Sequence, residues 1–216
     1  MSPLVALILS YLFVFSIIFI ATIVQKLRGL SAEFSRKFVH IGVGNWVFVA
    51  LYLFTDWRWA LIPPVSFVLI NYLSYRYSIF KAMELEEKNP GTIYYAISLT
   101  ILTFLAFQNF PVQILFYLGI VVMTWGDGMA AVIGKKWPVK VMRQGRSIGG
   151  AMAFFLFSSI ASFIFLSLYS DFSVTGRVFI GLGISMFGAL VEMFSPKNWD
   201  NITVPLATAL LTGIFI

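Results

Sequence analysis

Long apolar runs that few charged residues interrupt are the feature of this sequence that most restricts its fold. Hydrophobic residues make up 60% of the chain. Charged residues make up only 11%, whereas a soluble domain carries about 25%. Inside a bilayer the backbone must satisfy its own hydrogen bonds, so only helices and closed barrels cross it. The strict alternation of barrel strands is absent, and the sequence therefore predicts an all-α integral membrane protein.

A helix needs about 20 residues to cross the apolar core of a bilayer. On that basis the sequence predicts eight transmembrane helices, at residues 3–24, 38–54, 59–75, 93–108, 112–133, 148–169, 177–194 and 203–216. No basic residue precedes the first span, which indicates a retained helix and not a signal peptide. Because these spans leave little chain over, we expect a polytopic bundle that forms a single transmembrane domain over residues 1–216.

The distribution of Lys and Arg predicts how this bundle is oriented, since cytosolic loops carry an excess of both residues. With the N-terminus outside, 13 of the 15 Lys and Arg residues fall on one side, in the segments 25–37, 76–92, 134–147 and 195–202. Only Arg58 and Arg177 fall on the other side. We therefore expect both termini outside and those four loops in the cytosol. The net charge of +6 is then mainly a signal of topology.

The composition also excludes several classes of function. The basic residues lie on short membrane loops without an element that could read a nucleic-acid groove, so nucleic acid is not an expected partner. The absence of Cys excludes disulfides, thiolate catalysis and Cys-ligated metals. A single His excludes a zinc site built from several histidines.

Two acidic residues inside apolar spans, Asp127 and Glu192, are the strongest candidates for function. Asp127 lies in the run 121–133, which is otherwise apolar enough to cross the membrane, and Glu192 lies near the end of the span 177–194. A charge at the centre of a membrane helix costs at least about 2.5 kcal/mol, so intramembrane acids usually meet a cation, a metal ion or water and serve a function.

The predicted topology gathers most polar residues at the cytosolic side of the bundle. Besides the two acids, this set comprises Arg36, Lys37, His40, Lys135, Lys136, Arg146, Asp200 and Asn201. Simpler interpretations exist, because basic residues can anchor helices at the interface, a His can lie at a helix contact and an Asp can cap a helix. Together, however, carboxylates can hold Mg²⁺, and cations with glycine-rich backbone can hold phosphates. No Walker sequence is present, which excludes a P-loop kinase.

Five short polar or glycine-containing segments follow one another along the chain, at residues 36–40, 91–95, 126–134, 146–150 and 200–205. In this order they resemble the dolichol kinase and phytol kinase superfamily of CTP-dependent lipid kinases. The resemblance implies that the CTP and metal region includes Asp127, Gly134, Arg146, Ser147 and Gly150. The sequence departs from the family at Arg146, where Lys is usual, and at Gly149 and Ala151. The short chain resembles the shorter phytol or prokaryotic members, and a prokaryotic cytoplasmic membrane is the expected location, with the active site on the cytosolic side that the Lys and Arg distribution predicts.

The resemblance further implies transfer of the CTP γ-phosphate to the hydroxyl of a membrane lipid alcohol, such as a polyprenol, phytol or geranylgeraniol. We assign Mg²⁺ to Asp127 together with Glu192 or Asp200. The proton of the alcohol goes to His40 or to one of these carboxylates. The expected CTP-binding residues are Arg36, Lys37, Gly126, Gly128, Gly134, Lys135, Lys136, Arg146, Ser147, Gly150 and Asn201.

Two other functions stay open at this point. A cytidylyltransferase acting on a lipid phosphate would use the same cations and Mg²⁺, but would release pyrophosphate and not CDP. A small ion-coupled transporter could use Asp127 and Glu192 as ion ligands, although it would spread polar residues through the membrane depth on both sides. The sequence also does not decide the identity and length of the lipid alcohol, or whether the phosphate donor is CTP or ATP. The oligomeric state is open as well, and a homodimer is one of the options.

The topology predicts that single cysteines placed in the loops 76–92 and 134–147 react with a membrane-impermeant thiol reagent only from the cytosolic side. These two loops carry eight of the 15 Lys and Arg residues, and the native chain has no Cys to obscure the signal. Labelling of intact and of permeabilised cells measures the side directly. Reaction of the two loops from opposite sides would contradict the shared cytosolic face.

Overall fold

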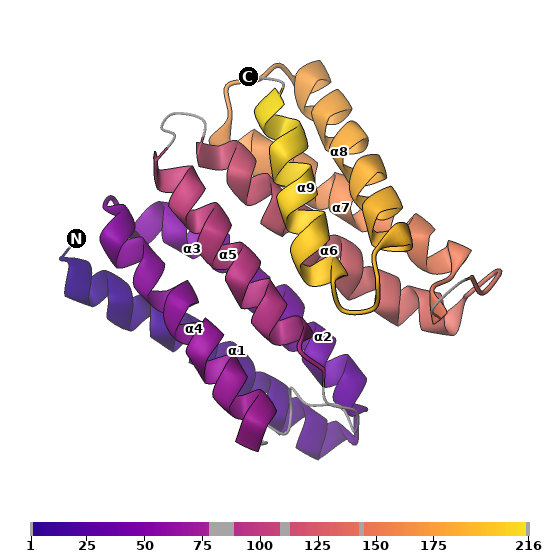
Figure 1. The fold of residues 1–216 in the computed structure, drawn as a ribbon, viewed down its shortest axis with the longest axis horizontal. Helices are drawn as coiled ribbons and strands as arrows, with labels where there is room; N and C mark the ends of the chain where they lie inside the picture. The colour runs from indigo at the N-terminus through magenta and orange to yellow at the C-terminus, as the bar shows by residue number, and fades with distance from the viewer. Residues whose placement is uncertain (1, 78–88, 109–112, 143–144, 215–216) are drawn as a thin grey trace.

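The computed structural model describes residues 2–77, 89–108, 113–142 and 145–214, and its regular structure there is helical. Figure 1 shows the helices as a bundle. They are α1 Pro3–Arg28, α2 Ala32–Gly44, α3 Trp46–Leu53, α4 Trp57–Tyr77, α5 Gly91–Gln108, α6 Gln113–Lys136, α7 Ile148–Tyr169, α8 Val174–Phe194 and α9 Asp200–Ile214. The all-α prediction is confirmed. Among the described residues the only β-type pairing is an isolated bridge between Val141 and Ser147.

Within the described ranges, five helices are long and apolar enough to cross a membrane, namely α1, α5, α6, α7 and α8. Many large apolar side chains on the outside of the bundle are exposed, such as Leu4, Ile8, Leu12 and Phe19 on α1. Such an exposed apolar surface fits lipid as the surrounding solvent. The remaining predicted spans correspond to α4, to α9 and to the pair α2 and α3.

The span predicted at 38–54 is divided into two helices at Asn45. The Asn45 side-chain Nδ2 donates to the Ile41 carbonyl at 3.0 Å, beside the ordinary helical bond from the Asn45 backbone N–H, and α2 ends one residue before Asn45. Its Oδ1 accepts a hydrogen bond from Trp125 Nε1 of α6 at 3.1 Å. A polar side chain that bonds its own backbone competes with helix continuation. Asn45 therefore ends the helix that carries Arg36, Lys37 and His40, and fastens that end to α6.

Local capping sets the start of the two helices that matter most for the polar side of the molecule. Ser31 Oγ accepts a hydrogen bond from Phe34 N–H at the start of α2. Ser147 Oγ accepts one from Gly150 N–H at the start of α7. Gly29 precedes α2 with a positive φ of 61°, a conformation that glycine adopts without strain. The short turn between α1 and α2 follows from these residues.

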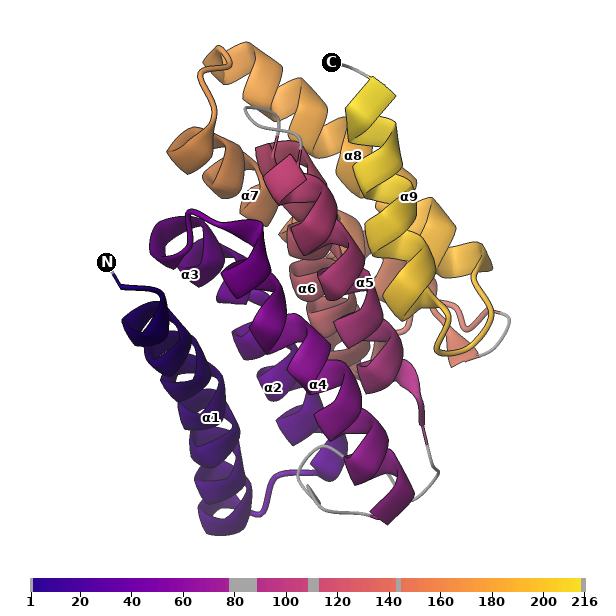
Figure 2. The same ribbon diagram turned by 60° about the vertical axis from the view of Figure 1, so that its left-hand side comes forward.

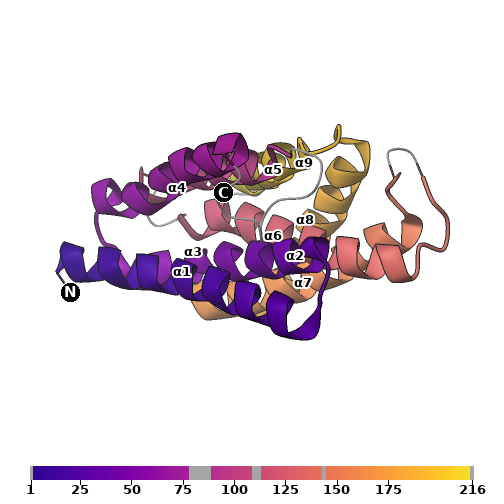
Figure 3. The same ribbon diagram turned by 90° about the horizontal axis from the view of Figure 1, so that it is seen from below.

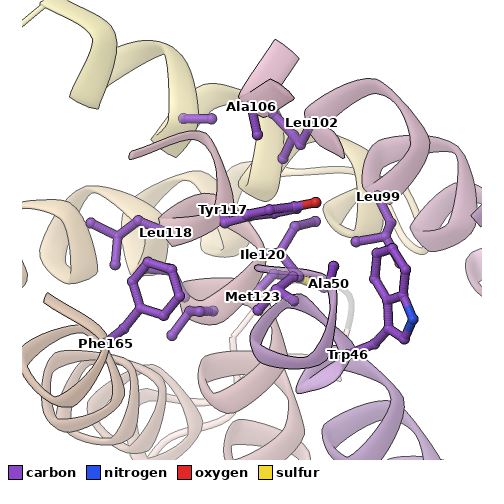
Figure 4. Packing of buried hydrophobic residues seen from close by; sticks show 14 of the residues in the cluster. Trp46, Ala50, Leu99, Leu102, Ala106, Tyr117, Leu118, Ile120, Met123 and Phe165 are labelled. Carbon is purple, nitrogen blue, oxygen red and sulfur yellow. The ribbon is translucent and has the colours of Figure 1, made fainter. Parts of the chain in front are cut away.

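Helix α6 forms the centre of the bundle. It packs against α2, α3, α5, α7, α8 and α9, and Figure 3 shows α5 and α9 on one side of it and α2 and α7 on the other. Tyr117, Leu118, Ile120 and Met123 of α6 are completely buried, and Figure 4 shows them among apolar side chains from neighbouring helices. Helix α1 lies at the edge of the bundle, with α4 beside it (Figure 2).

Glycine allows α9 to approach α6 closely. A Cβ atom at Gly119 would collide with the Pro205 carbonyl oxygen and crowd Ala209 and Thr208. Gly183 of α8, in contrast, has open space where its Cβ would lie. The two glycines therefore form a matched pair for testing the packing.

Gly119→Leu is expected to destabilise the bundle, because the backbone of α9 blocks the added side chain and overpacking of this kind costs about 1–3 kcal/mol or more. Gly183→Leu is expected to leave stability nearly unchanged, since its side chain meets no protein atom. Thermal unfolding in detergent micelles measures the difference. Equal midpoints for the two variants would contradict the close contact between α6 and α9.

Candidate functional site

A buried charged cluster joins α2 to α6. Lys37 Nζ lies 2.6 Å from Asp127 Oδ2, and His40 Nε2 lies 3.4 Å from the same oxygen. The side chains of Lys37 and Asp127 are only 10% and 11% exposed. An isolated charge at such a position would be costly, so each ion depends on the other. The sequence placed these three residues in one site, and the structure brings them into contact.

The cluster forms because α2 presents two residues on one face and because small residues let that face approach α6. Lys37 and His40 are three positions apart and thus lie on the same side of the helix. A Cβ atom at Gly44 would collide with Thr124 and Tyr95, and one at Gly128 would collide with Ile41. The glycines keep α2 close enough for Lys37 to reach Asp127.

Tyr95 of α5 fixes the position of the His40 ring. The two ring centroids are 4.5 Å apart, and the Tyr95 hydroxyl shares a 2.6 Å hydrogen bond with Thr124 Oγ1 of α6. His40 Nε2 also lies 3.5 Å from the Met123 carbonyl oxygen. An imidazole held through Nε2 in this way leaves Nδ1 as the nitrogen that can take or give a proton.

A second buried cluster centres on Arg146. Its Nε lies 3.1 Å from Glu192 Oε1 and its Nη2 lies 3.2 Å from Asp200 Oδ2. Its Nη1 donates to the Ser195 carbonyl oxygen at 2.6 Å. The guanidinium thus joins the start of α7 to the end of α8 and the start of α9. The predicted phosphate role of Arg146 and the predicted metal role of Glu192 stay predictions, because here the two residues neutralise each other.

One cavity is lined by residues of α1 to α6 and of α9 and contains much of the predicted site. Its polar wall includes Arg36, Lys37, His40, Asp127, Asp200 and Asn201. Arg36 Nε is buried and has no hydrogen-bond partner among the residues that the structure describes. A buried guanidinium nitrogen without a partner is a favourable position for an anion such as a phosphate.

The predicted Mg²⁺ ligands are Asp127 together with Glu192 or Asp200. Within the described part of the chain, no group of three His, Cys, Asp or Glu residues is close enough to hold a metal ion. A pair of carboxylates is not tested by that finding and stays a prediction. Asp127 and Asp200 nevertheless line the same cavity, and Mg²⁺ is usually held by one or two carboxylates together with substrate phosphates. These two residues fit that requirement.

Electrostatics around Asp200 favour a bound cation. This residue precedes the span predicted at 203–216, and burial raises the pKa of its carboxyl above the usual range. The nearby Asp127 carboxylate raises that pKa further, whereas Arg146 lowers it. Each carboxylate makes ionisation of the other less favourable, so a positive ion between the two would stabilise their charged forms.

Several predicted nucleotide-binding residues have structural roles. A Cβ at Gly126 would collide with the Phe154 ring. Ser147 Oγ donates to the Gly134 carbonyl at 3.3 Å, and a Cβ on Gly134 would crowd Ser147 and Gly150. Lys135 pairs with Glu33 at the surface, and Lys136 lies over the Trp137 ring at 4.4 Å. A nucleotide contact for these residues, as for Gly128, stays a prediction.

The structure also adds polar residues that the sequence interpretation left out. Asn71 and Asn198 line the cavity, and Asn71 Nδ2 donates to the Thr92 carbonyl at 3.0 Å. Asn198 has a positive φ of 71°. A buried amide in the apolar helix α4 was the available signal for Asn71, because polar residues inside membrane helices usually bond to a neighbouring helix.

Comparison with known proteins gives several relatives across most of the chain. It is 34% identical over 200 residues to a phytol kinase of Synechocystis sp., covering 91% of this chain and 85% of the relative. It is 28% identical to phytol kinase 1, chloroplastic, of Arabidopsis thaliana, covering 86% and 67%. An uncharacterised protein of Methanocaldococcus jannaschii is 25% identical, covering 83% and 92%. No family model matches the chain, and no solved structure matches it.

The buried pair predicts a characteristic pattern of stability. Lys37→Met is expected to lower the free energy of unfolding by about 3–5 kcal/mol, because it leaves Asp127 buried without its cation. Combining it with Asp127→Asn is expected to recover most of that loss. The control is Lys135→Met, whose exposed pair with Glu33 is expected to contribute about 0–1 kcal/mol. Unfolding in detergent measures all three, and an equal loss in Lys37→Met and Lys135→Met would contradict the burial of the pair.

Proposed function

The chain belongs to the phytol kinase family, and from this membership we propose that it is an integral membrane kinase that phosphorylates the hydroxyl of a lipid alcohol. The finer proposal is transfer of the γ-phosphate of CTP to an isoprenoid alcohol such as phytol, geranylgeraniol or a polyprenol. We further propose that residues 1–216 act as one catalytic domain of eight spans, with the site facing the cytosol.

The observation that carries this proposal is that the lining of the cavity is charged in one part and apolar in another. Lys37, His40 and Asp127 meet at one end of it. Apolar side chains such as Trp46, Phe67 and Leu99 line another part. A lipid alcohol has the same division, with one reactive hydroxyl and a long apolar remainder. Such a substrate can place its hydroxyl at the charged cluster while its chain stays out of water.

Basic side chains in the charged part of the cavity can bind the phosphates of the donor nucleotide. Phosphoryl transfer depends mainly on alignment and on neutralising the charge of the transferred group. Arg36 has an unpartnered, buried nitrogen, and Lys37 lies beside it on α2. We assign both to the phosphates of the nucleotide. Asn201 and Asn198 line the same cavity and supply amide groups that can orient the donor.

We assign Mg²⁺ to Asp127 and Asp200, the two carboxylates of the cavity. When bound, the ion would neutralise phosphate charge at these two acids. In the transfer, a bond forms between the alcohol oxygen and the γ-phosphorus, and the bond from that phosphorus to the β–γ bridging oxygen breaks. The nucleoside diphosphate leaves with that electron pair. The alcohol proton passes to His40, whose ring Tyr95 holds in place.

The assay that tests the function uses purified protein, Mg²⁺, and CTP or ATP labelled in either the α- or the γ-phosphate, with phytol, geranylgeraniol or their monophosphates as acceptors. The γ-label is expected to enter the lipid, the α-label to stay in the soluble diphosphate, and chelation of Mg²⁺ to stop the reaction. Entry of the α-label into a lipid phosphate, with release of pyrophosphate, would show a cytidylyltransferase. Transfer to none of the lipids would contradict both enzyme proposals.

Asp127→Asn is expected to lower turnover by about two orders of magnitude or more, the scale of removing one preorganised electrostatic group. The amide keeps the shape of the side chain but loses the charge that pairs with Lys37 and holds the metal ion. The matched control is Asp171→Asn, an exposed acid between α7 and α8, which is expected to keep full activity. Near-normal turnover of Asp127→Asn would make Asp127 a structural residue only.

A further inference from the structure

The cavity continues beyond its charged end as an apolar arm, which we define by Val14, Val43, Trp46, Pro63, Pro64 and Leu99. These residues come from α1, α2, α3, α4 and α5. Their side chains are hydrocarbon except for the Trp46 indole nitrogen, and that nitrogen donates to Ser10 Oγ at 2.5 Å. The arm therefore offers a ligand apolar contacts only.

The arm has a definite length along the helices. Asn71 lies at the polar end and Pro63 in the arm, eight residues earlier on α4, which corresponds to about 12 Å at 1.5 Å per residue. This length is too great for a small polar substrate and suits a hydrocarbon chain.

Trp46 is the bulkiest side chain of the arm. The residue is 2% exposed, and the hydrogen bond to Ser10 fixes the orientation of its indole against α1. Ala50 and Phe54, which follow along the chain, are buried in the apolar core together with Trp46. Because the indole is large and held in one position, it sets where a chain that enters from the charged end must stop or turn.

We propose that this arm binds the hydrocarbon chain of an isoprenoid alcohol, and that Trp46 determines which chain lengths are accepted. The proposal rests on the proposed kinase function for the placement of the hydroxyl at His40 and Asp127. It adds where the hydrocarbon chain of the alcohol binds and which residue limits the length of that hydrocarbon chain. The apolar lining and its continuity with the charged cluster identify the ligand class as an alcohol with one polar end.

Two substitutions change the arm in opposite directions. Val14→Phe fills it near Trp46, because Val14 is one turn from Ser10 on α1. It is expected to lower kcat/KM for a C20 alcohol by about tenfold or more relative to a C5 alcohol, the effect of a few methylene groups in an apolar pocket. Trp46→Leu opens the end and is expected to shift the preference toward longer chains. The matched control is Val65→Phe, half exposed on the outer face of α4, which is expected to leave the ratio unchanged.

Photolabelling tests the arm independently of catalysis and on the unmodified protein. A C15 isoprenoid alcohol with a diazirine at the end of its chain is expected to crosslink to peptides that contain Trp46, Pro63 and Pro64, or Leu99. Excess phytol is expected to compete with this labelling, whereas an alkane of equal length is not.

The two experiments separate this inference from the proposed function. Labelling of the arm by a protein that phosphorylates no alcohol would support the site and contradict the kinase. An active wild-type protein whose crosslinks map elsewhere, or whose Val14→Phe and Val65→Phe variants share one chain-length profile, would overturn the arm and leave the kinase in place. Equal competition by the alkane would also overturn it, since the arm would then bind any hydrocarbon.

Discussion

The ion pair between Lys37 and Asp127 is the interaction on which the rest of the structure depends. Two buried charges are tolerated only if they remain in contact. Contact requires α2 to lie against α6, and this requires the glycines at positions 44 and 128. It also requires α2 to end at Asn45, whose side chain is bonded to Trp125. The contact between α2 and α6 therefore depends both on the close packing at these glycines and on the buried ion pair.

The charges near the cavity are close to balance before any substrate binds. Lys37 offsets Asp127, and Arg146 offsets Glu192 and Asp200 in part. Arg36 has no acidic partner among the ion pairs of the described residues. A metal ion and a phosphate group that enter together would add charges of opposite sign, so the bound site would stay near neutrality. In a region of low dielectric this balance limits the cost of binding a highly charged donor.

The sequence predicted the helical class, because twenty-residue apolar runs leave a membrane chain few alternatives. It also predicted Lys37, His40 and Asp127, since charges in apolar surroundings are conspicuous. It could not predict their pairing, which joins residues 90 positions apart, nor the division of α2 from α3, which depends on one Asn with a partner on α6. Gly126 and Gly128 were predicted to contact the nucleotide, which stays a prediction, and the structure shows in addition that Phe154 and Ile41 occupy the space where their Cβ atoms would lie. A glycine pattern does not distinguish room for a ligand from room for a neighbouring helix.

The long separation between Lys37 and Asp127 also has a consequence for biosynthesis. A ribosome adds about 5–20 residues per second, so Asp127 emerges several seconds after Lys37. Until then α2 cannot lower its ammonium group into the bilayer and must keep it at the headgroup level. Helix α9, which brings Asp200 to the cavity, is made later still. The cavity can therefore be complete only when nearly the whole chain has been translated.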